Sequence, residues 1–100
     1  MRYLVVVTPA AEANLDEILR FIALDNPVAG RKFVAGLRAK LKTLARMPKR
    51  CPLALEDGLD GIELRHLIHG NYRIIFVIDP WQLTILQVRH AARRRMGKDR

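Results

Sequence analysis

The chain has 100 residues, of which 50% are hydrophobic and 28% charged, a composition typical of a folded globular protein. Because a chain of this size buries about two-thirds of its unfolded surface, we expect one domain over residues 1–100 and exclude a multidomain enzyme. The single cysteine, Cys51, excludes an internal disulfide. No apolar run reaches the roughly 18 residues of a membrane span, and no signal peptide is recognised, so we expect a cytoplasmic protein with no membrane partner.

The charge of the chain is strongly basic and unevenly spread. Lys and Arg number 18 against 10 Asp and Glu, which gives a formal net charge of +8. Residues 26–55 carry eight basic side chains and no acidic ones, and residues 89–100 carry six basic and one acidic. The segments before and between these blocks are net acidic. An excess of this size predicts an acidic partner, either nucleic acid or an acidic protein.

The N-terminal quarter predicts a strand followed by a helix. Tyr3–Val7 is a β-branched run that Thr8-Pro9 ends. Thr8 can cap the helix with Pro9 at its first position, and this helix should end near Asp25. Its apolar residues recur at helical spacing: Leu15, Ile18, Leu19 and Ile22.

A second helix should begin directly afterwards, because Asn26-Pro27 repeats the pattern of cap and proline. Met47-Pro48 should end it. One side of this helix is apolar, with Phe33, Val34, Leu37, Leu41 and Leu44, and another carries a basic stripe of Arg31, Arg38, Lys42 and Arg46. The stripe is either a solvated face or the contact for an acidic partner. Residues 49–61 hold prolines and glycines without periodicity and predict a surface loop.

The pattern changes to strands after this loop. Ile62–Ile68, Tyr72–Ile78 and Leu83–Val88 are separated by short turns, which leave room only for an antiparallel meander. The basic tail from His90 has no apolar face. A β-α-α-β-β-β order with one helical hairpin and one sheet predicts an α+β fold of two layers, joined by the N-terminal strand.

Metal and thiol chemistry are weakly supported. His66 and His69 lie three residues apart on a predicted strand, so their side chains should point to opposite faces, and no paired-ligand motif completes a metal site. Cys51 follows Arg50, which would favour a thiolate, but a lone cysteine in a loop is more often incidental. We therefore expect no metal and no catalytic thiolate.

The cations of the C-terminal half are more informative. Successive strands and the segment after them carry Arg65, Arg73, Arg89, His90 and Arg93. A meander could gather them to hold a phosphodiester, with His90 as general acid or base. In the alternative interpretation, Arg73 pairs with Glu63 or Asp79, and the tail is solvated charge.

Several motifs together resemble the RelE/ParE superfamily of type II toxin–antitoxin toxins. Thr8-Pro9-Ala10-Ala11-Glu12 is similar to the start of the family's first helix, and Asp25-Asn26-Pro27 to its inter-helix junction. The strand motifs are Glu63-Leu64-Arg65, Gly70-Asn71-Tyr72-Arg73-Ile74-Ile75-Phe76, and Ile85-Leu86-Gln87-Val88-Arg89-His90 with Arg93. The resemblance covers nearly the whole chain and implies the β-α-α-β-β-β fold.

The superfamily implies two different activities on one scaffold. RelE-like members are similar to ribosome-dependent endoribonucleases that cut messenger RNA without a metal, whereas ParE-like members resemble poisons of DNA gyrase. The helical junction looks more like the ParE branch. Ala91 stands where the ribonucleases place an arginine, and no tyrosine follows Tyr72. The resemblance therefore favours gyrase inhibition. The alternative is cleavage of messenger RNA on the ribosome with Arg65, Arg73, His90 and Arg93, and a third hypothesis is a non-toxic chain that binds only an antitoxin.

The family also implies a cognate antitoxin, ParD-like, which binds the toxin as a hetero-oligomer through an acidic C-terminal segment, and it implies no cofactor. A segment that orders on contact would match apolar grooves and the two basic blocks. The residues expected to contact the antitoxin or the target are Arg31, Arg38, Lys42, Arg46, Arg89, Arg93, Arg94 and Arg95.

Overall fold

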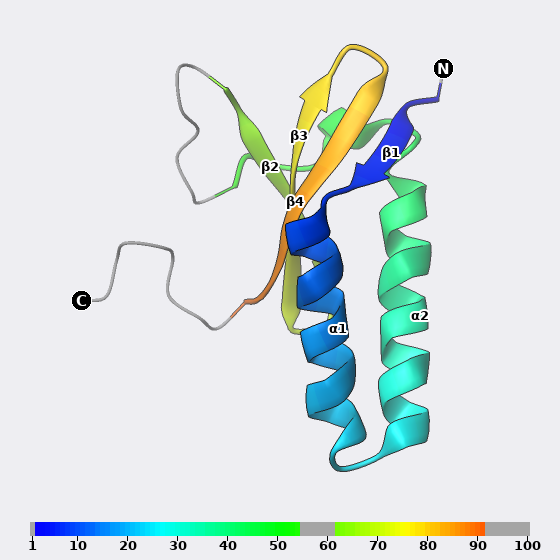
Figure 1. Cartoon of the computed structure of the whole chain (residues 1–100). Helices are drawn as coiled ribbons and strands as arrows, with labels where there is room; N and C mark the ends of the chain where they lie inside the picture. Colours follow the sequence, from blue (N-terminus) through cyan, green and yellow to red (C-terminus); the bar gives the residue numbers. More distant parts are fainter. Residues whose placement is uncertain (1, 55–61, 92–100) are drawn as a thin grey trace, which may run out of the picture.

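The computed structural model describes residues 2–54 and 62–91, and their order is the predicted β-α-α-β-β-β (Figure 1). The elements are β1 (Leu4–Val7), α1 (Pro9–Ala23), α2 (Pro27–Thr43), β2 (Leu64–His69), β3 (Tyr72–Asp79) and β4 (Gln82–His90), with a short 3-10 turn, η1 (Pro48–Arg50), after α2. The α+β class predicted from the sequence is confirmed.

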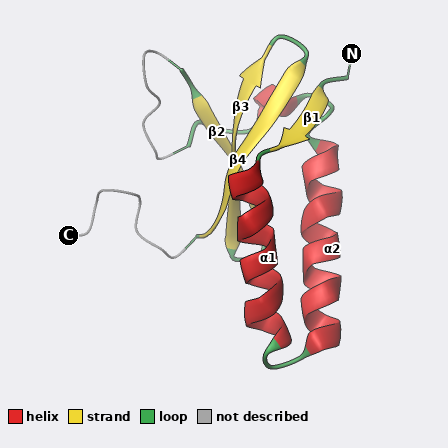
Figure 2. Cartoon of the chain, in the orientation of Figure 1, coloured by secondary structure: helices red, strands yellow, loops and turns green. Residues whose placement is uncertain are grey.

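The strands form one sheet in the order β1-β4-β3-β2. Strands β2, β3 and β4 are the predicted antiparallel meander, and β1 joins it in parallel beside β4. Strand β1 pairs only with the first half of β4, from Gln82 to Ile85. The two helices lie side by side as an antiparallel hairpin (Figure 2). The second half of β4 therefore has an edge that no strand covers in the described part of the chain.

Both helices begin at the predicted caps. The backbone N–H of Ala11 donates to Thr8 Oγ1 at 3.1 Å, and that of Ala29 donates to Asn26 Oδ1 at 3.0 Å. Each cap is followed by a proline at the first helical position. These side chains satisfy donors that a helix leaves unpaired at its start, which fixes where each helix begins.

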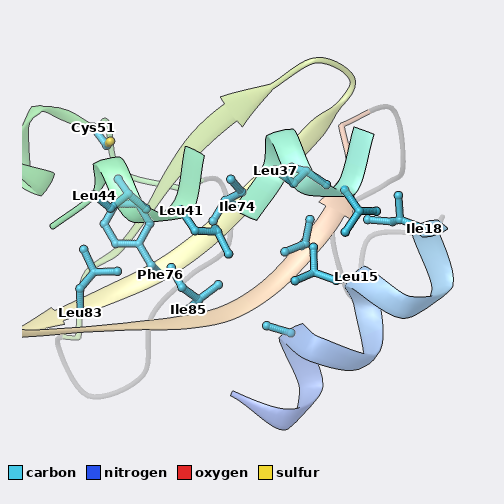
Figure 3. Close-up of a cluster of buried hydrophobic side chains, with 13 residues drawn as sticks. Leu15, Ile18, Leu37, Leu41, Leu44, Cys51, Ile74, Phe76, Leu83 and Ile85 are labelled. Carbon is cyan, nitrogen blue, oxygen red and sulfur yellow. The ribbon is translucent and has the colours of Figure 1, made fainter. Parts of the chain in front are cut away.

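The core lies between the hairpin and one face of the sheet (Figure 3). The helices contribute leucines and isoleucines to it, among them Leu15, Ile18, Leu37, Leu41 and Leu44. The sheet contributes alternate residues of β3 and β4, which include Ile74, Phe76, Leu83 and Ile85. Burying each large side chain contributes about 1.5–3 kcal/mol, so this cluster is the main stabilising term. Tyr72 and His90 lie on this same face of the sheet, at one end of the cluster.

The helices approach most closely near the loop that joins them. A Cβ built on Gly30 would lie 3.1 Å from both the Leu19 carbonyl oxygen and the Ala23 nitrogen. Only a residue without a side chain lets the two backbones pack at this distance. Gly30 therefore holds the start of α2 tightly against the end of α1.

Some predicted boundaries differ from the structure. Strand β4 continues beyond its predicted end at Val88 to His90, because Arg89 and His90 pair with Arg73 and Tyr72 of β3, so His90 belongs to the sheet and not to the predicted tail. Helix α2 ends at Thr43, earlier than its predicted end at Met47-Pro48. The following residues form turn hydrogen bonds three residues apart, which tighten and end the helix before Pro48.

Candidate partner-binding groove

An open groove of about 750 Å³ lies between α1 and the second half of β4. The wall from α1 is a stripe at helical spacing, made of Ala10, Asn14, Glu17 and Phe21 with Ile18 behind it. The opposite wall consists of Tyr72 of β3 and Gln87, Val88, Arg89 and His90 of β4. The groove thus combines an acidic group, basic groups and aromatic rings along the uncovered edge of the sheet.

A β-bulge shapes the strand wall of this groove. Ile75 pairs with Gln87 and Phe76 with Ile85, so Leu86 is the extra residue in β4. Thr8 anchors the bulge, because its hydroxyl donates to the Ile85 carbonyl at 2.8 Å while accepting from α1. One side chain therefore fixes both the start of α1 and the bend of β4.

Asn14 joins the two walls. Its Oδ1 accepts a hydrogen bond of 3.0 Å from the backbone N–H of Val88. This donor lies in the half of β4 that β1 does not pair with, so the asparagine takes the place of a neighbouring strand. Asn14 keeps α1 at a fixed distance from the strand and closes part of the edge.

Aromatic and histidine rings cross the end of the sheet beside the groove. His69, Tyr72 and His90 are paired across three adjacent strands, and Phe33 of α2 packs on His69 and Tyr72. The ring centroids are 5.6 Å apart for Phe33 and His69, 5.5 Å for Phe33 and Tyr72, and 5.1 Å for Tyr72 and His90. These tilted and edge-on contacts hold Tyr72 and His90 in place at the groove.

The register does not gather the cations of the ribonuclease hypothesis on one face. Arg73 is 4% exposed and lies on the face away from the helices, where its Nη1 is 3.1 Å from His66 Nδ1. Arg65 lies on the helix side but pairs with Phe76, four residues along β3 from the partner of His90, which is about 13 Å. The two groups are thus far apart along the sheet, and Arg93 lies outside the described residues.

Arg65 is bound within the fold. Its Nη1 donates to the Cys51 carbonyl at 2.6 Å and its Nη2 lies 3.4 Å from Glu63 Oε1. These contacts tie the segment after α2 to β2, and Leu53 forms a bridge to Arg65 in the same place. The start of the predicted surface loop is therefore attached to the sheet. Residues 55–61 of that loop lie outside the described residues.

The basic stripe of α2 is divided by one ion pair. Arg38 donates to both carboxylate oxygens of Glu12 on α1, at 2.8 and 3.2 Å. The hydrogen bond from Arg38 lowers the pKa of Glu12 below its ordinary value. Arg31, Lys42 and Arg46 are exposed. The stripe therefore presents three accessible cations, while Arg38 links the helices.

The remaining expected contacts fall at the end of β4 and beyond it. Arg89 lines the groove, and its Nη1 donates to Gln87 Oε1 at 3.3 Å. Arg94 and Arg95 lie outside the described residues. Asn14, Glu17 and Phe21 were not among the predicted site residues, although their spacing at i, i+3 and i+7 beside the apolar stripe was the signal for a second functional face.

Cys51 is 2% exposed, and burial raises the pKa of its thiol, so it is a packing residue rather than a thiolate. Among the residues that the structure describes, no three His, Cys, Asp or Glu side chains gather as metal ligands would. His66 and His69 point to opposite faces of β2, as predicted. Neither described helix is long and apolar enough to cross a membrane.

Solved structures that the chain resembles include a toxin and toxin–antitoxin complexes. The chain is similar to a chain of the chromosomal ParDE system from P. aeruginosa, with 19% identity and a TM-score of 0.69 over 89% of this chain and 96% of that one. It is also similar to a chain of the RelBE2 toxin–antitoxin complex from Mycobacterium tuberculosis, with 25% identity and a TM-score of 0.64 over 93% and 95%. E. coli RelE in the free state, a mutant, matches with 18% identity and a TM-score of 0.55 over 92% and 86%. No curated protein sequence matches the chain.

The fold and these likenesses define a toxin of the RelE/ParE superfamily. The family model of the ParE toxin of the type II toxin–antitoxin system parDE matches residues 5–95. The chain therefore belongs to the ParE toxin family, and it is the toxin of a type II toxin–antitoxin system whose partner is an antitoxin.

Proposed function

We propose that this chain acts in the cytoplasm as a ParE-like inhibitor of DNA gyrase, without a cofactor, and that a ParD-like antitoxin neutralises it. The observation that carries the proposal is the separation of the cations. A cradle for a phosphodiester needs several cations directed at one point. Arg73 lies on one face of the sheet, whereas Arg65 and His90 lie apart on the other. A poison that acts by binding does not need such a cradle.

The groove is the proposed site of the antitoxin. A segment that orders on contact can bury apolar side chains against Phe21 and Tyr72 while its carboxylates meet Arg89. Arg31 and Lys42, two exposed cations of α2, can contact further carboxylates of the antitoxin outside the groove.

Purified gyrase tests the proposal. With relaxed plasmid DNA and ATP, we expect micromolar chain to suppress supercoiling and to trap the cleaved complex, and equimolar antitoxin to reverse both effects. The matched control is the chain added as its antitoxin complex. Full supercoiling with no trapped cleavage would reject gyrase as the target.

Ribosome-dependent cleavage of messenger RNA is the second candidate. It is favoured by His90, which lies in the groove beside Tyr72, because an imidazole there could transfer a proton to a bound substrate. This candidate predicts cleaved messenger RNA in a purified translation system with the wild-type chain and intact messenger RNA with His90→Ala. Intact messenger RNA with the wild type would exclude it.

A further inference from the structure

The end of the sheet opposite the groove exposes three large apolar side chains. Leu4 is 64% exposed, Met47 74% and Trp81 58%. Trp81 lies in the turn directly before β4, and the groove lies at the end of that strand, about 25 Å away. Figure 1 shows the turn between β3 and β4 beside the first residues of the chain and far from the helical loop. We call these three residues the turn-end patch.

Backbone hydrogen bonds bring the segments that carry the three residues to the same end of the sheet. The N–H of Leu4 donates to the Trp81 carbonyl at 2.8 Å, and the N–H of Tyr3 donates to the Ala45 carbonyl at 2.8 Å, two residues before Met47. The rings of Tyr3 and Trp81 contact each other with centroids 5.9 Å apart. Three segments that are distant in sequence therefore meet at this end.

Two members of the patch have a strained backbone. Met47 has φ 50° and Trp81 has φ 66°, and they are the described residues other than glycine with a positive φ. Trp81 follows Pro80 in a two-residue turn, a position that normally takes glycine. A bulky residue in this conformation costs stability, and such residues cluster at functional sites. Met47 and Trp81 are thus exposed although their backbone conformation costs stability.

The surroundings of the patch are basic. The segments at this end, residues 2–4, 45–50 and 79–82, carry Arg2, Arg46, Lys49 and Arg50, with Asp79 as their one acidic residue. Arg50 donates to the carbonyls of Arg46 and Met47 at 2.9 and 3.2 Å, which fixes the left-handed turn at Met47. Arg46 and Lys49 are exposed.

We propose that the turn-end patch is the surface with which the toxin docks on its target protein, and that the complementary surface is an apolar pocket surrounded by carboxylates. Tryptophan and methionine are typical anchors of protein interfaces, and the basic residues supply the polar rim. Nucleic acid would need several stacking rings, whereas two of the three patch residues are not aromatic. The target in this inference rests on the proposed gyrase inhibition.

The test replaces strained residues by ones that fit the backbone better. In Trp81→Gly the turn becomes Pro-Gly, so we expect a melting temperature no lower than that of the wild type. We expect its affinity for purified gyrase to fall by about tenfold or more, as for an interface anchor. Met47→Gly should behave in the same way. The matched control is Leu24→Ser, which removes an equally apolar side chain, 88% exposed, at the helical loop and should bind as the wild type does.

The outcomes separate the patch from the proposed target. The proposed role of the patch is overturned if Trp81→Gly binds gyrase with the affinity of the wild type. It is also overturned if Trp81→Gly melts well below the wild type, because the ring would then stabilise the fold. Should the wild type not bind gyrase, the gyrase proposal fails, and growth arrest at matched expression decides the patch. Arrest that is lost in Trp81→Gly and kept in Leu24→Ser supports it. Three results would overturn the proposed role of the patch: equal growth arrest by the wild type and Trp81→Gly, no growth arrest by the wild type, or a loss of arrest in Trp81→Gly that parallels a loss of binding to ribosomal RNA.

Discussion

The two ends of β4 expose different kinds of surface. At the groove the side chains are held by partners: Asn14 accepts a hydrogen bond from a strand N–H, and the rings of Tyr72 and His90 contact each other edge-on. At the turn-end patch, Met47 and Trp81 are exposed in strained conformations. The groove suits a flexible segment that folds into it, and the patch suits a preformed protein surface. A chain of this size can thus offer two partners two separate sites.

The largest expected effect comes from the core that connects the two ends. Phe76 is fully buried between α2 and the sheet. Phe76→Ala should lower the free energy of unfolding by about 3–5 kcal/mol, because it leaves a cavity as well as losing buried area. Urea denaturation measures this change. A loss below about 1 kcal/mol would show that the two ends do not depend on a shared core.

The next effect acts through the helix that forms one wall of the groove. Gly30→Leu places a side chain where even a Cβ would lie 3.1 Å from the backbone of α1. We expect a loss of about 1–3 kcal/mol and weaker antitoxin binding, because α1 must move. Binding at the patch should change less. Calorimetry with both partners, using Ala35→Leu on the exposed side of α2 as control, checks this.

Thr8 connects α1 with the bulge of β4. Thr8→Ala removes the cap and the contact with Ile85, so we expect a loss of about 1–2 kcal/mol in the free energy of unfolding. Thr8→Ser keeps the hydroxyl and should recover most of this loss. Equal losses in both variants would mean that the methyl group, and not the hydrogen bonds, matters at this position.

Asn14 distinguishes the ends most specifically. Asn14→Leu keeps the size of the side chain but leaves the Val88 N–H without its acceptor, which should cost about 1 kcal/mol at this half-buried site. Antitoxin affinity should fall with it, while Trp81 fluorescence and target binding stay unchanged. A parallel loss of target binding would show that the ends are coupled.

The smallest effect concerns the pair of Glu12 and Arg38, whose side chains are 46% and 43% exposed. Because Arg38 lowers the pKa of Glu12, the pair stabilises the chain above the ordinary value of 4.5, and this contribution is lost as the pH falls through the lowered pKa. Glu12→Gln should cost less than about 1 kcal/mol at neutral pH. Urea denaturation in acid should show the free energies of unfolding of the wild type and Glu12→Gln converging. A difference that stays constant with pH would contradict the role of the Glu12 charge.

Local signals in the sequence were sufficient for the fold. Thr8 and Asn26, each followed by proline, predicted both helix starts, and apolar runs separated by short turns predicted the meander. These features act through neighbouring residues. The predicted ends of α2 and β4 were wrong. Turn hydrogen bonds end α2, and pairing with Tyr72 extends β4 to His90, and neither is visible in local composition.

The sites needed the three-dimensional register. Arg65, Arg73 and His90 look equivalent along the chain, but one residue of register places Arg73 on the opposite face. Arg38 belongs to the predicted stripe, yet a partner 26 residues away engages it. The patch was not predictable, because the segments that carry Leu4, Met47 and Trp81 are distant in sequence and are joined only by hydrogen bonds of the folded chain. Charge and periodicity report single elements, whereas these sites are made between elements.

Hydrogen–deuterium exchange of the toxin with and without its antitoxin tests the separation of the two ends most directly. The account predicts slower exchange in α1 and in the second half of β4, which line the groove. It predicts unchanged exchange at Met47 and in the turn that contains Trp81. Slower exchange in that turn, with none along the groove, would contradict the account.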